Sequence, residues 1–253
     1  MLEDYIWEKQ REKGLLLMAH VIVGYPSMEE SFELVRTIVE AGVDLMELQI
    51  PFSEPIADGP VILQANQAAL ADSIKVDDCF KFACKVTDTF DIPFLFMTYY
   101  NIVLKRGEER FFAEAREAGI RGAIVPDLPP EEGESYLAAA AANNIDPILI
   151  LTPTSSPQRI IYLARFGRGF FYCVARKGVT GAETDFSSSM TEFLGRCRRA
   201  TQLPLALGFG VSSKEDVEFL RGKAEVAVVG SQALRVLNTK GIQAVGDFFR
   251  GLR

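Results

Sequence analysis

Eight short apolar segments, each followed by a helical pattern, constrain the fold of this chain more than any other feature of the sequence. Most are nearly continuous apolar runs bounded by Gly or Pro, which is typical of buried strands in a parallel sheet. Strands that alternate with helices form parallel sheets, and 253 residues match the about 250 of one (β/α)8 barrel. We therefore expect an α/β fold of the TIM barrel type; an open doubly wound sheet, which usually has fewer units, is the alternative. The strands are expected at 15–23, 45–50, 93–98, 122–125, 147–151, 169–174, 205–207 and 226–229.

We expect this barrel to occupy residues 1–253 as a single domain, with a short amphipathic helix at 2–13 and further extra helices. Ser27 or Ser31 can cap the helix that follows the first strand and ends at Glu40. Residues 99–101 are expected to form a loop, and Ser231 to open a short helical segment. Other helices are expected at 60–71, 76–86, 107–118, 131–143, 158–165, 188–199, 214–221 and 241–249.

The composition indicates a soluble intracellular protein that does not bind nucleic acid. Hydrophobic residues make up 48% of the chain, enough for a large core, and the net charge is −7. The short basic run at 196–199 is interpreted as a solvated helix end. The four cysteines form no CxxC pair, so we expect free thiols in a reducing compartment rather than disulfides or zinc ligands. We find no signal peptide and no apolar run of the ~18 residues that a membrane span requires. The expected location is the cytoplasm.

Two acidic residues in the stretch 47–60 (ELQIPFSEPIADGP) are the strongest candidates for chemistry. Glu47 lies within the second expected strand and shares a face with Gln49, because side chains alternate along a strand. Burial would raise its pKa from about 4.3 toward neutrality, which suits a general acid or base. The alternative is a structural ion pair with a basic residue of a neighbouring strand. Asp58 follows 11 positions later, on the loop, where an Asp-Gly turn is the simpler interpretation unless it faces Glu47.

Glycine-rich segments after the last three expected strands indicate a site for a phosphorylated ligand. They are 178–181, 208–210 and 230–231. Backbone N–H groups of such loops and of helix N-termini bind anions, and barrels of this type commonly hold phosphate after their last two strands. Each segment alone could be an ordinary tight turn. The loop 176–186 is long for such a connection and is interpreted as a lid, with a disordered surface loop as the alternative.

These segments resemble, in order, those of the tryptophan synthase alpha chain family. The stretch 47–60 is similar to the family signature ELGIPFSDPxADGP, and further matches lie at 24–26, 97–101, 126–129, 177–181, 208–212 and 230–231. The resemblance implies a TIM barrel that cleaves indole-3-glycerol phosphate to indole and glyceraldehyde 3-phosphate, a lyase reaction of tryptophan biosynthesis. It implies no metal and no cofactor in this chain.

The resemblance also implies roles for particular residues. Glu47 would protonate indole C3 and take the glycerol hydroxyl proton, and Asp58 would stabilise charge at the indole N–H. Tyr172 would orient Glu47, and Thr180 would tie a closed lid to Asp58. The residues expected at the phosphate are Gly181, Gly210, Gly230 and Ser231. Those expected around the indole are His20, Gln49, Tyr99 and Ile124.

The partner that the resemblance implies is a beta chain that carries pyridoxal phosphate, in an αββα heterotetramer with internal passage of indole. Loops at 52–58 and 98–101 would form the contact. A different barrel that binds phosphosugars would explain the glycine-rich loops but not the stretch 47–60.

Three residues depart from the family pattern. Gln49 replaces a glycine and would fill substrate space or hydrogen-bond the Glu47 carboxylate. His20, the only histidine, stands where an apolar aromatic residue is usual. It is interpreted as a buried, hydrogen-bonded histidine rather than a catalytic one, because no residue near it in the sequence pairs with it. Glu54 replaces an aspartate. These departures favour a second hypothesis, in which the chain mainly activates the beta chain and turns over its own substrate poorly.

Overall fold

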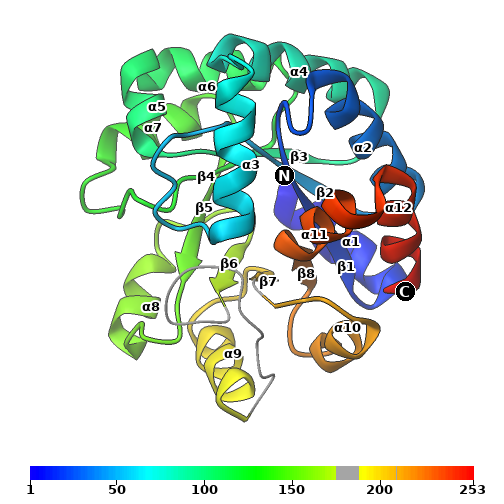
Figure 1. Ribbon diagram of the computed structural model, residues 1–253. Coiled ribbons are helices and arrows are strands. Elements are labelled where there is room, and N and C mark those ends of the chain that lie inside the picture. The colour runs from blue at the N-terminus through cyan, green and yellow to red at the C-terminus, as the bar shows by residue number, and fades with distance from the viewer. Residues whose placement is uncertain (175–187, 209) are drawn as a thin grey trace.

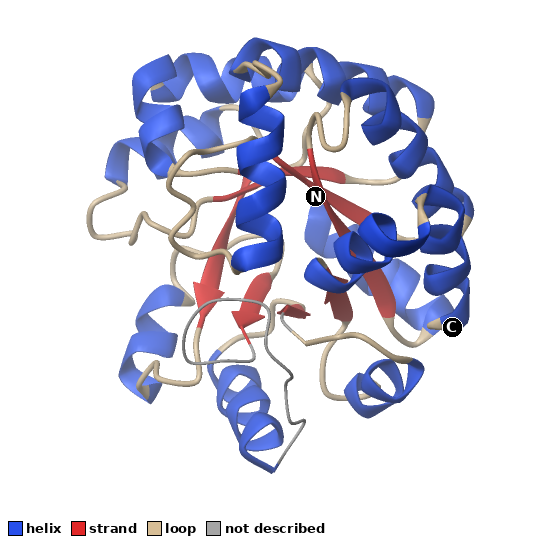
Figure 2. Ribbon diagram, viewed as in Figure 1, coloured by secondary structure: helices blue, strands red, loops and turns tan. Residues whose placement is uncertain are grey.

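The predicted barrel is confirmed by the computed structural model, which describes residues 1–174, 188–208 and 210–253. Eight parallel strands close in sequence order, and β8 pairs with β1 (Figure 1). The helices surround the sheet (Figure 2). The strands are β1 Leu16–Ile22, β2 Leu45–Gln49, β3 Phe94–Met97, β4 Gly122–Ile124, β5 Asp146–Leu151, β6 Phe171–Val174, β7 Leu205–Gly208 and β8 Val226–Val229. The helices are α1 Leu2–Lys13, α2 Met28–Glu40, α3 Pro60–Ala71, α4 Val76–Thr89, α5 Tyr100–Arg106, α6 Glu108–Glu117, α7 Glu134–Ala142, α8 Pro157–Leu163, α9 Ser188–Ala200, α10 Lys214–Leu220, α11 Ser231–Lys240 and α12 Ile242–Gly251.

Alternation along each strand divides the apolar residues between two cores. On β1, Leu16 and Met18 join the cluster inside the barrel, whereas Leu17, Ala19 and Val21 join the larger cluster between strands and helices. Both faces of a parallel strand are thus buried, which is why the sequence shows continuous apolar runs. A polar residue on the inner face is therefore buried among apolar side chains and needs a hydrogen-bond partner or a functional role.

Helix α1 closes the N-terminal end of the barrel. Leu2 and Ile6 belong to the inner cluster, and the backbone N–H of Leu2 donates to Asp146 Oδ2 at 3.2 Å. A Cβ on Gly122 would stand 2.9 Å from the Leu2 side chain, so the close fit depends on glycine there. The inner core therefore ends at α1, and any open site must lie at the other end.

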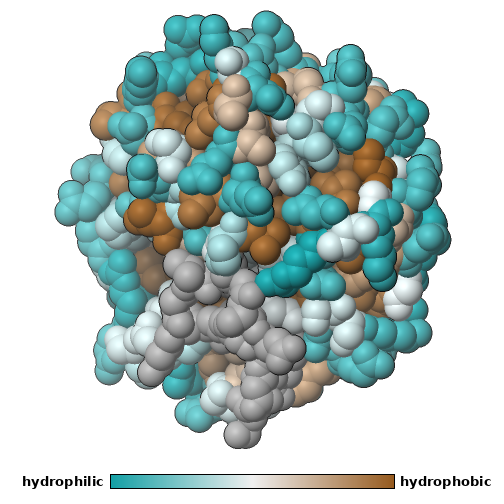
Figure 3. Space-filling model, viewed as in Figure 1, coloured by the Kyte–Doolittle hydropathy of each residue, from teal (hydrophilic) through white to brown (hydrophobic). Residues whose placement is uncertain are grey.

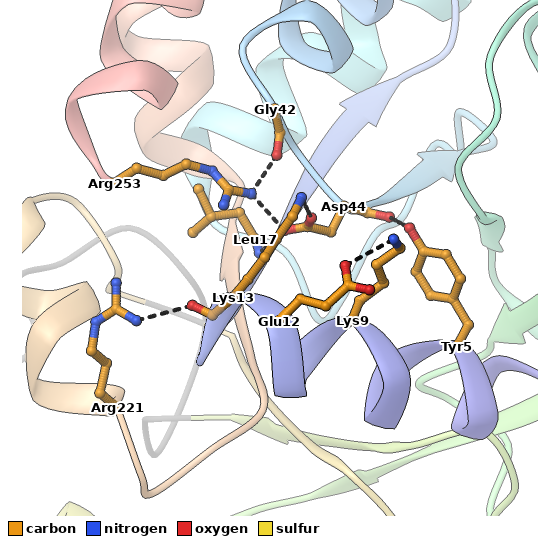
Figure 4. Close-up of polar contacts among 9 residues, drawn as sticks. All are labelled: Tyr5, Lys9, Glu12, Lys13, Leu17, Gly42, Asp44, Arg221 and Arg253. Atoms are coloured by element: carbon orange, nitrogen blue, oxygen red, sulfur yellow. Dashed lines mark hydrogen bonds and ion pairs between the residues drawn. The ribbon is translucent and has the colours of Figure 1, made fainter.

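A buried carboxylate, which we call the Asp44 clasp, joins distant segments at this closed end (Figure 4). Asp44 accepts hydrogen bonds from the Leu17 N–H at 2.9 Å and from Arg253 at 2.7 Å, and it pairs with Lys13. Tyr5 donates to its backbone carbonyl at 3.0 Å. One side chain thus connects α1, β1 and the C-terminal residue.

Helix α5 was not expected from the sequence, which predicted only a loop at 99–101. Its first turn is completed by a residue from another loop, because Asp127 accepts the Tyr100 N–H at 2.9 Å. A cap that comes from 27 positions away leaves no local signal. The choice of cap for α2 is also decided: Ser27 accepts the Glu30 N–H, while Ser31 is buried and accepts the Gly24 N–H.

Two smaller expectations concern cysteines and membranes. The four cysteines are free thiols, as predicted. Over the ranges that the structure describes, we find no helix with the length and apolar character needed to span a bilayer.

Candidate active site

Glu47 and His20 meet inside the barrel at adjacent strands. The parallel register places His20 of β1 directly beside Glu47 of β2. Both side chains are 4% exposed, and the ring Nδ1 is hydrogen-bonded to Glu47 Oε1. His20 is therefore buried and hydrogen-bonded, as the sequence indicated. Its partner is not near it in the sequence: the register brings Glu47 to it across 27 positions.

Asp58 lies at the same mouth and is held by two donors. Gln49 Nε2 donates to Asp58 Oδ2 at 2.7 Å, and the Tyr99 hydroxyl donates to the same oxygen at 3.1 Å. The Ala57 N–H in turn donates to the Tyr99 hydroxyl at 3.1 Å, which fixes the loop. Gln49 thus hydrogen-bonds a carboxylate, but the partner is Asp58 rather than the expected Glu47.

Burial and mutual charge shift the pKa values of this group. Burial alone would lower the pKa of His20, but the charge and hydrogen bond of Glu47 raise it above the ordinary value, with smaller upward contributions from Asp58 and Gln49. Burial raises the pKa of Asp58, and His20, Gln49 and Tyr99 offset that rise only in part. The charge of Glu47 also raises the pKa of Asp58.

Tyr172 of β6 faces both acids from the other side of the barrel. Burial, followed by the charges of Glu47 and Asp58, holds its pKa well above the ordinary value. Gly208 of β7 leaves the room for this ring, since a Cβ there would stand 2.6 Å from Tyr172 Cζ. Ile124 and Tyr99 belong to the apolar cluster below, which forms the floor of the mouth.

The expected phosphate residues are placed only in part. Gly230 precedes α11 and lies against His20, close enough that a Cβ on the glycine would stand 3.4 Å from the His20 Cβ. Ser231 is the first residue of α11, whose N-terminus can attract an anion. Gly210 follows β7 with φ of 101°, a conformation that favours glycine. Thr180, Gly181 and the expected lid at 176–186 lie outside the described residues.

Asn66 supports this site and was missed in the sequence. It is fully buried in α3, accepts the Phe52 N–H at 3.0 Å and donates to the Ile62 carbonyl at 2.9 Å. It thereby anchors the loop that carries Asp58. The signal available was an amide within the apolar helical spacing 62, 65, 66 and 69, because a buried amide requires partners.

Comparisons with known proteins decide the family. The model of the family described as "Tryptophan synthase alpha chain" matches residues 7–246. The chain belongs to the tryptophan synthase alpha chain family. Alpha chains of Syntrophotalea carbinolica and Desulforapulum autotrophicum are 59% and 56% identical, each over 100% of both chains.

Solved structures of the family have the same fold. A chain of Mycobacterium tuberculosis tryptophan synthase superposes with a TM-score of 0.93 at 30% identity, over 99% of this chain and 96% of that one. The Legionella pneumophila alpha chain gives a TM-score of 0.88 at 27% identity, over 99% and 95%. Membership of the tryptophan synthase alpha chain family assigns this chain to tryptophan biosynthesis, as a lyase that acts on indole-3-glycerol phosphate.

Proposed function

We propose that Glu47 and Asp58 carry out the cleavage of indole-3-glycerol phosphate to indole and glyceraldehyde 3-phosphate. The observation that carries this assignment is the convergence of both acids at one barrel mouth, where the charge of Glu47 acts on Asp58. Active sites of such barrels lie at the C-terminal ends of the strands, where Glu47 and the Asp58 loop are found.

The reaction breaks a carbon–carbon bond and needs a proton at indole C3 and a base at the glycerol hydroxyl. Glu47 lies on a strand and is held by a hydrogen bond, so it is fixed in the way that proton transfer requires. Asp58 would receive the indole N–H as positive charge develops on the ring. Tyr172 would act as a positioning residue that faces Glu47 and keeps its own proton.

The phosphate would bind at the N-terminus of α11. Gly230 and Ser231 supply the backbone there, and Gly210 lies after the neighbouring strand β7. The proposed contribution of Gly181, and of Thr180 to closure, follows from the family resemblance alone.

We further propose that the chain works in the cytoplasm in an αββα heterotetramer, whose beta chain supplies pyridoxal phosphate for the following step. Exposed apolar side chains on the two expected contact segments and their continuation support this contact: Ile56 is 72% and Leu104 57% exposed. A groove of about 600 Å³ lies beside them, lined in part by Phe52, Asn101 and Arg106. In Figure 3, apolar side chains reach the surface on both sides of α3. Thr98 and Tyr99 are buried, so only the end of the segment 98–101 would take part.

One observation favours the second candidate function, a chain that mainly activates its beta partner. Gln49 occupies Asp58 Oδ2, one of the two carboxylate oxygens that the indole N–H could use. A family member with glycine there would have no such competitor. Lyase assays with and without a beta chain, alongside beta-chain assays with and without this chain, separate the two candidates.

The decisive variant is Glu47→Gln. We expect it to abolish indole release, since one general acid or base contributes ~10²–10⁴-fold. Glu117→Gln, an exposed change on α6, is the matched control and should retain full activity. Retained indole release in Glu47→Gln would remove Glu47 from its role.

A further inference from the structure

The hydrogen bond between His20 and Glu47 is the starting point for a further inference, which rests on the proposed lyase function. The two residues are neighbours in the β1–β2 register, so their contact follows from the backbone. Each side chain is 4% exposed. Removing two charged groups from water costs desolvation free energy, so a buried ion pair is weak evidence for a stabilising role. We therefore expect a functional role for this pair.

Each residue of this pair has one polar atom that the other does not contact. Among the described residues, Glu47 Oε2 and His20 Nε2 have no hydrogen-bond partner, although both atoms are buried. Buried polar atoms are nearly always satisfied, so these two atoms are suited to a ligand or water in the mouth. Glu47 thus has one oxygen held by His20 and the other free to act.

The reaction poses a problem that a lone carboxyl does not solve easily. A carboxylate has no proton to give to indole C3, and a neutral carboxylic acid is a poor base for the hydroxyl. We propose that His20 and Glu47 act as one proton-carrying pair, in which imidazolium and carboxylate together hold the single proton that the reaction moves.

The transfers balance with no further reactant. The Nδ1 proton of His20 passes to the Glu47 carboxylate, and the neutral carboxyl so formed delivers that one proton to indole C3, which leaves the ring neutral and the carboxylate charged. The glycerol hydroxyl then gives its proton to the pair as the carbon–carbon bond breaks. The electron pair of that bond restores the indole ring, and the hydroxyl oxygen becomes the aldehyde carbonyl. The pair ends as it began.

The surroundings of His20 favour the charged ring. The acids that act on it are Glu47 of β2 and Asp58 of the following loop. Tyr99 and Tyr172 are the phenols of the mouth, and burial together with nearby acids raises the pKa of both, so they keep their protons. On the β8 side the ring lies against Gly230, which carries no charge. His20 acts through Glu47 and is a positioning residue that also stores the proton.

The first test observes His20 directly, which is feasible because the chain has one histidine. In protein labelled with ¹⁵N-histidine, NMR should show a ring whose second proton is lost at a pH above the ordinary His pKa of about 6.5. In Glu47→Gln this titration should move to lower pH, because the largest of the contributions that offset burial is then lost. A ring that loses its second proton below that ordinary value, or an unchanged titration in Glu47→Gln, would overturn the proposal.

The second test compares two replacements in the complex with the beta chain. His20→Asn keeps an N–H near the position of Nδ1 but cannot titrate, and His20→Phe keeps only the ring. We expect both to lower kcat at least about tenfold with little change in KM, since proton transfer is lost and binding is not. Val21→Ala, the next residue of β1 and on its outer face, is the control for strand repacking. It should lower Tm but leave kcat and its pH profile unchanged.

The outcomes separate this inference from the proposed function. If the wild type releases indole and His20→Asn has the same kcat and pH profile, then His20 only fills space. That result would leave the lyase assignment intact. No indole release from the wild-type chain, with or without beta chain, would contradict the lyase itself and with it the pair. A tenfold loss in His20→Asn together with the NMR titration would support both.

Discussion

Asp58 is the residue at which substrate and protein compete for one carboxylate. Gln49 and Tyr99 both donate to its Oδ2, at 2.7 and 3.1 Å. The tyrosine also anchors the loop through Ala57, so its hydrogen bond positions Asp58. Gln49 extends from the strand into the mouth, and among the described residues its side chain anchors no loop backbone; its other effect is a small upward contribution to the pKa of His20. Of the two donors to Asp58, Gln49 is therefore the one that can be replaced without releasing the loop.

We predict that Gln49→Gly raises the rate of indole release. The change removes one of the two donors at Asp58 Oδ2, so that the indole N–H competes with Tyr99 alone, and it clears space beside Glu47. The measurement is kcat and KM for indole-3-glycerol phosphate in the presence of the beta chain. An unaltered rate, given good turnover by the wild type, would mean that Gln49 does not obstruct the site.

The pH dependence should reflect the raised pKa of Asp58. Burial shifts protonation of this carboxyl to higher pH than the ordinary value of about 3.9, so activity that needs the ionised form is lost as pH falls through the raised pKa. Gln49 donates to the ionised form and lowers that pKa. Gln49→Gly should therefore move the acidic limb of the kcat profile to higher pH, and a shift to lower pH would refute this account.

Strand β7 ends in a glycine, Gly208, whose missing side chain leaves room for a residue of the site. Gly208 allows the Tyr172 ring of β6 to lie across the end of β7. The methyl group of an alanine at 208 would overlap ring atoms of Tyr172, and a rigid ring cannot move aside as the end of a flexible side chain can. A glycine at position 208 is therefore required for Tyr172 to occupy its position.

We predict that Gly208→Ala displaces Tyr172 and lowers kcat, with the protein still folded by circular dichroism. Gly195→Ala is the matched control, because a Cβ there meets only the Arg199 guanidinium at 3.6 Å. Gly195 lies within α9, where alanine is favoured over glycine by about 1 kcal/mol. That variant should be as active as the wild type and no less stable. Equal activity of both variants would show that the Tyr172 position is not critical.

At the scale of the whole molecule, the Asp44 clasp holds the closed end of the barrel while the open end does the chemistry. The Asp44 side chain is 1% exposed and satisfies a buried backbone N–H at Leu17 as well as two cations. Its loss would leave that N–H without an acceptor. Stability and activity are thus assigned to opposite ends.

We predict that Asp44→Ala lowers the free energy of unfolding by about 1–3 kcal/mol, the typical cost of an unsatisfied buried group. Urea unfolding measures this, and the kcat of the remaining folded protein should be unchanged. Arg36→Ala, at an exposed ion pair with Glu33, is the control and should cost at most about 1 kcal/mol. A loss of kcat in Asp44→Ala would show that the two ends are coupled.

The barrel could be predicted from sequence because most strands are nearly continuous apolar runs and each is followed by a helix. Alternation predicted that Glu47 and Gln49 share one face of their strand. Helix α5 could not be predicted, because Asp127 from a later loop caps it. The bond between Gln49 and Asp58 depends on how the loop folds back, and the partner of His20 depends on the register between strands. Both are tertiary facts without a local signal.

The order of the strands has a consequence for how the site comes together. Every strand pairs with the next along the chain, and only the seam between β8 and β1 joins the two ends of the sheet. Contacts that are local in sequence form early, whereas the seam must wait for the whole chain. His20 and Glu47 lie on the first two strands, while Gly230 reaches His20 only across the seam. During refolding, the acid and its imidazole should therefore find each other before there is anywhere for the phosphate to bind.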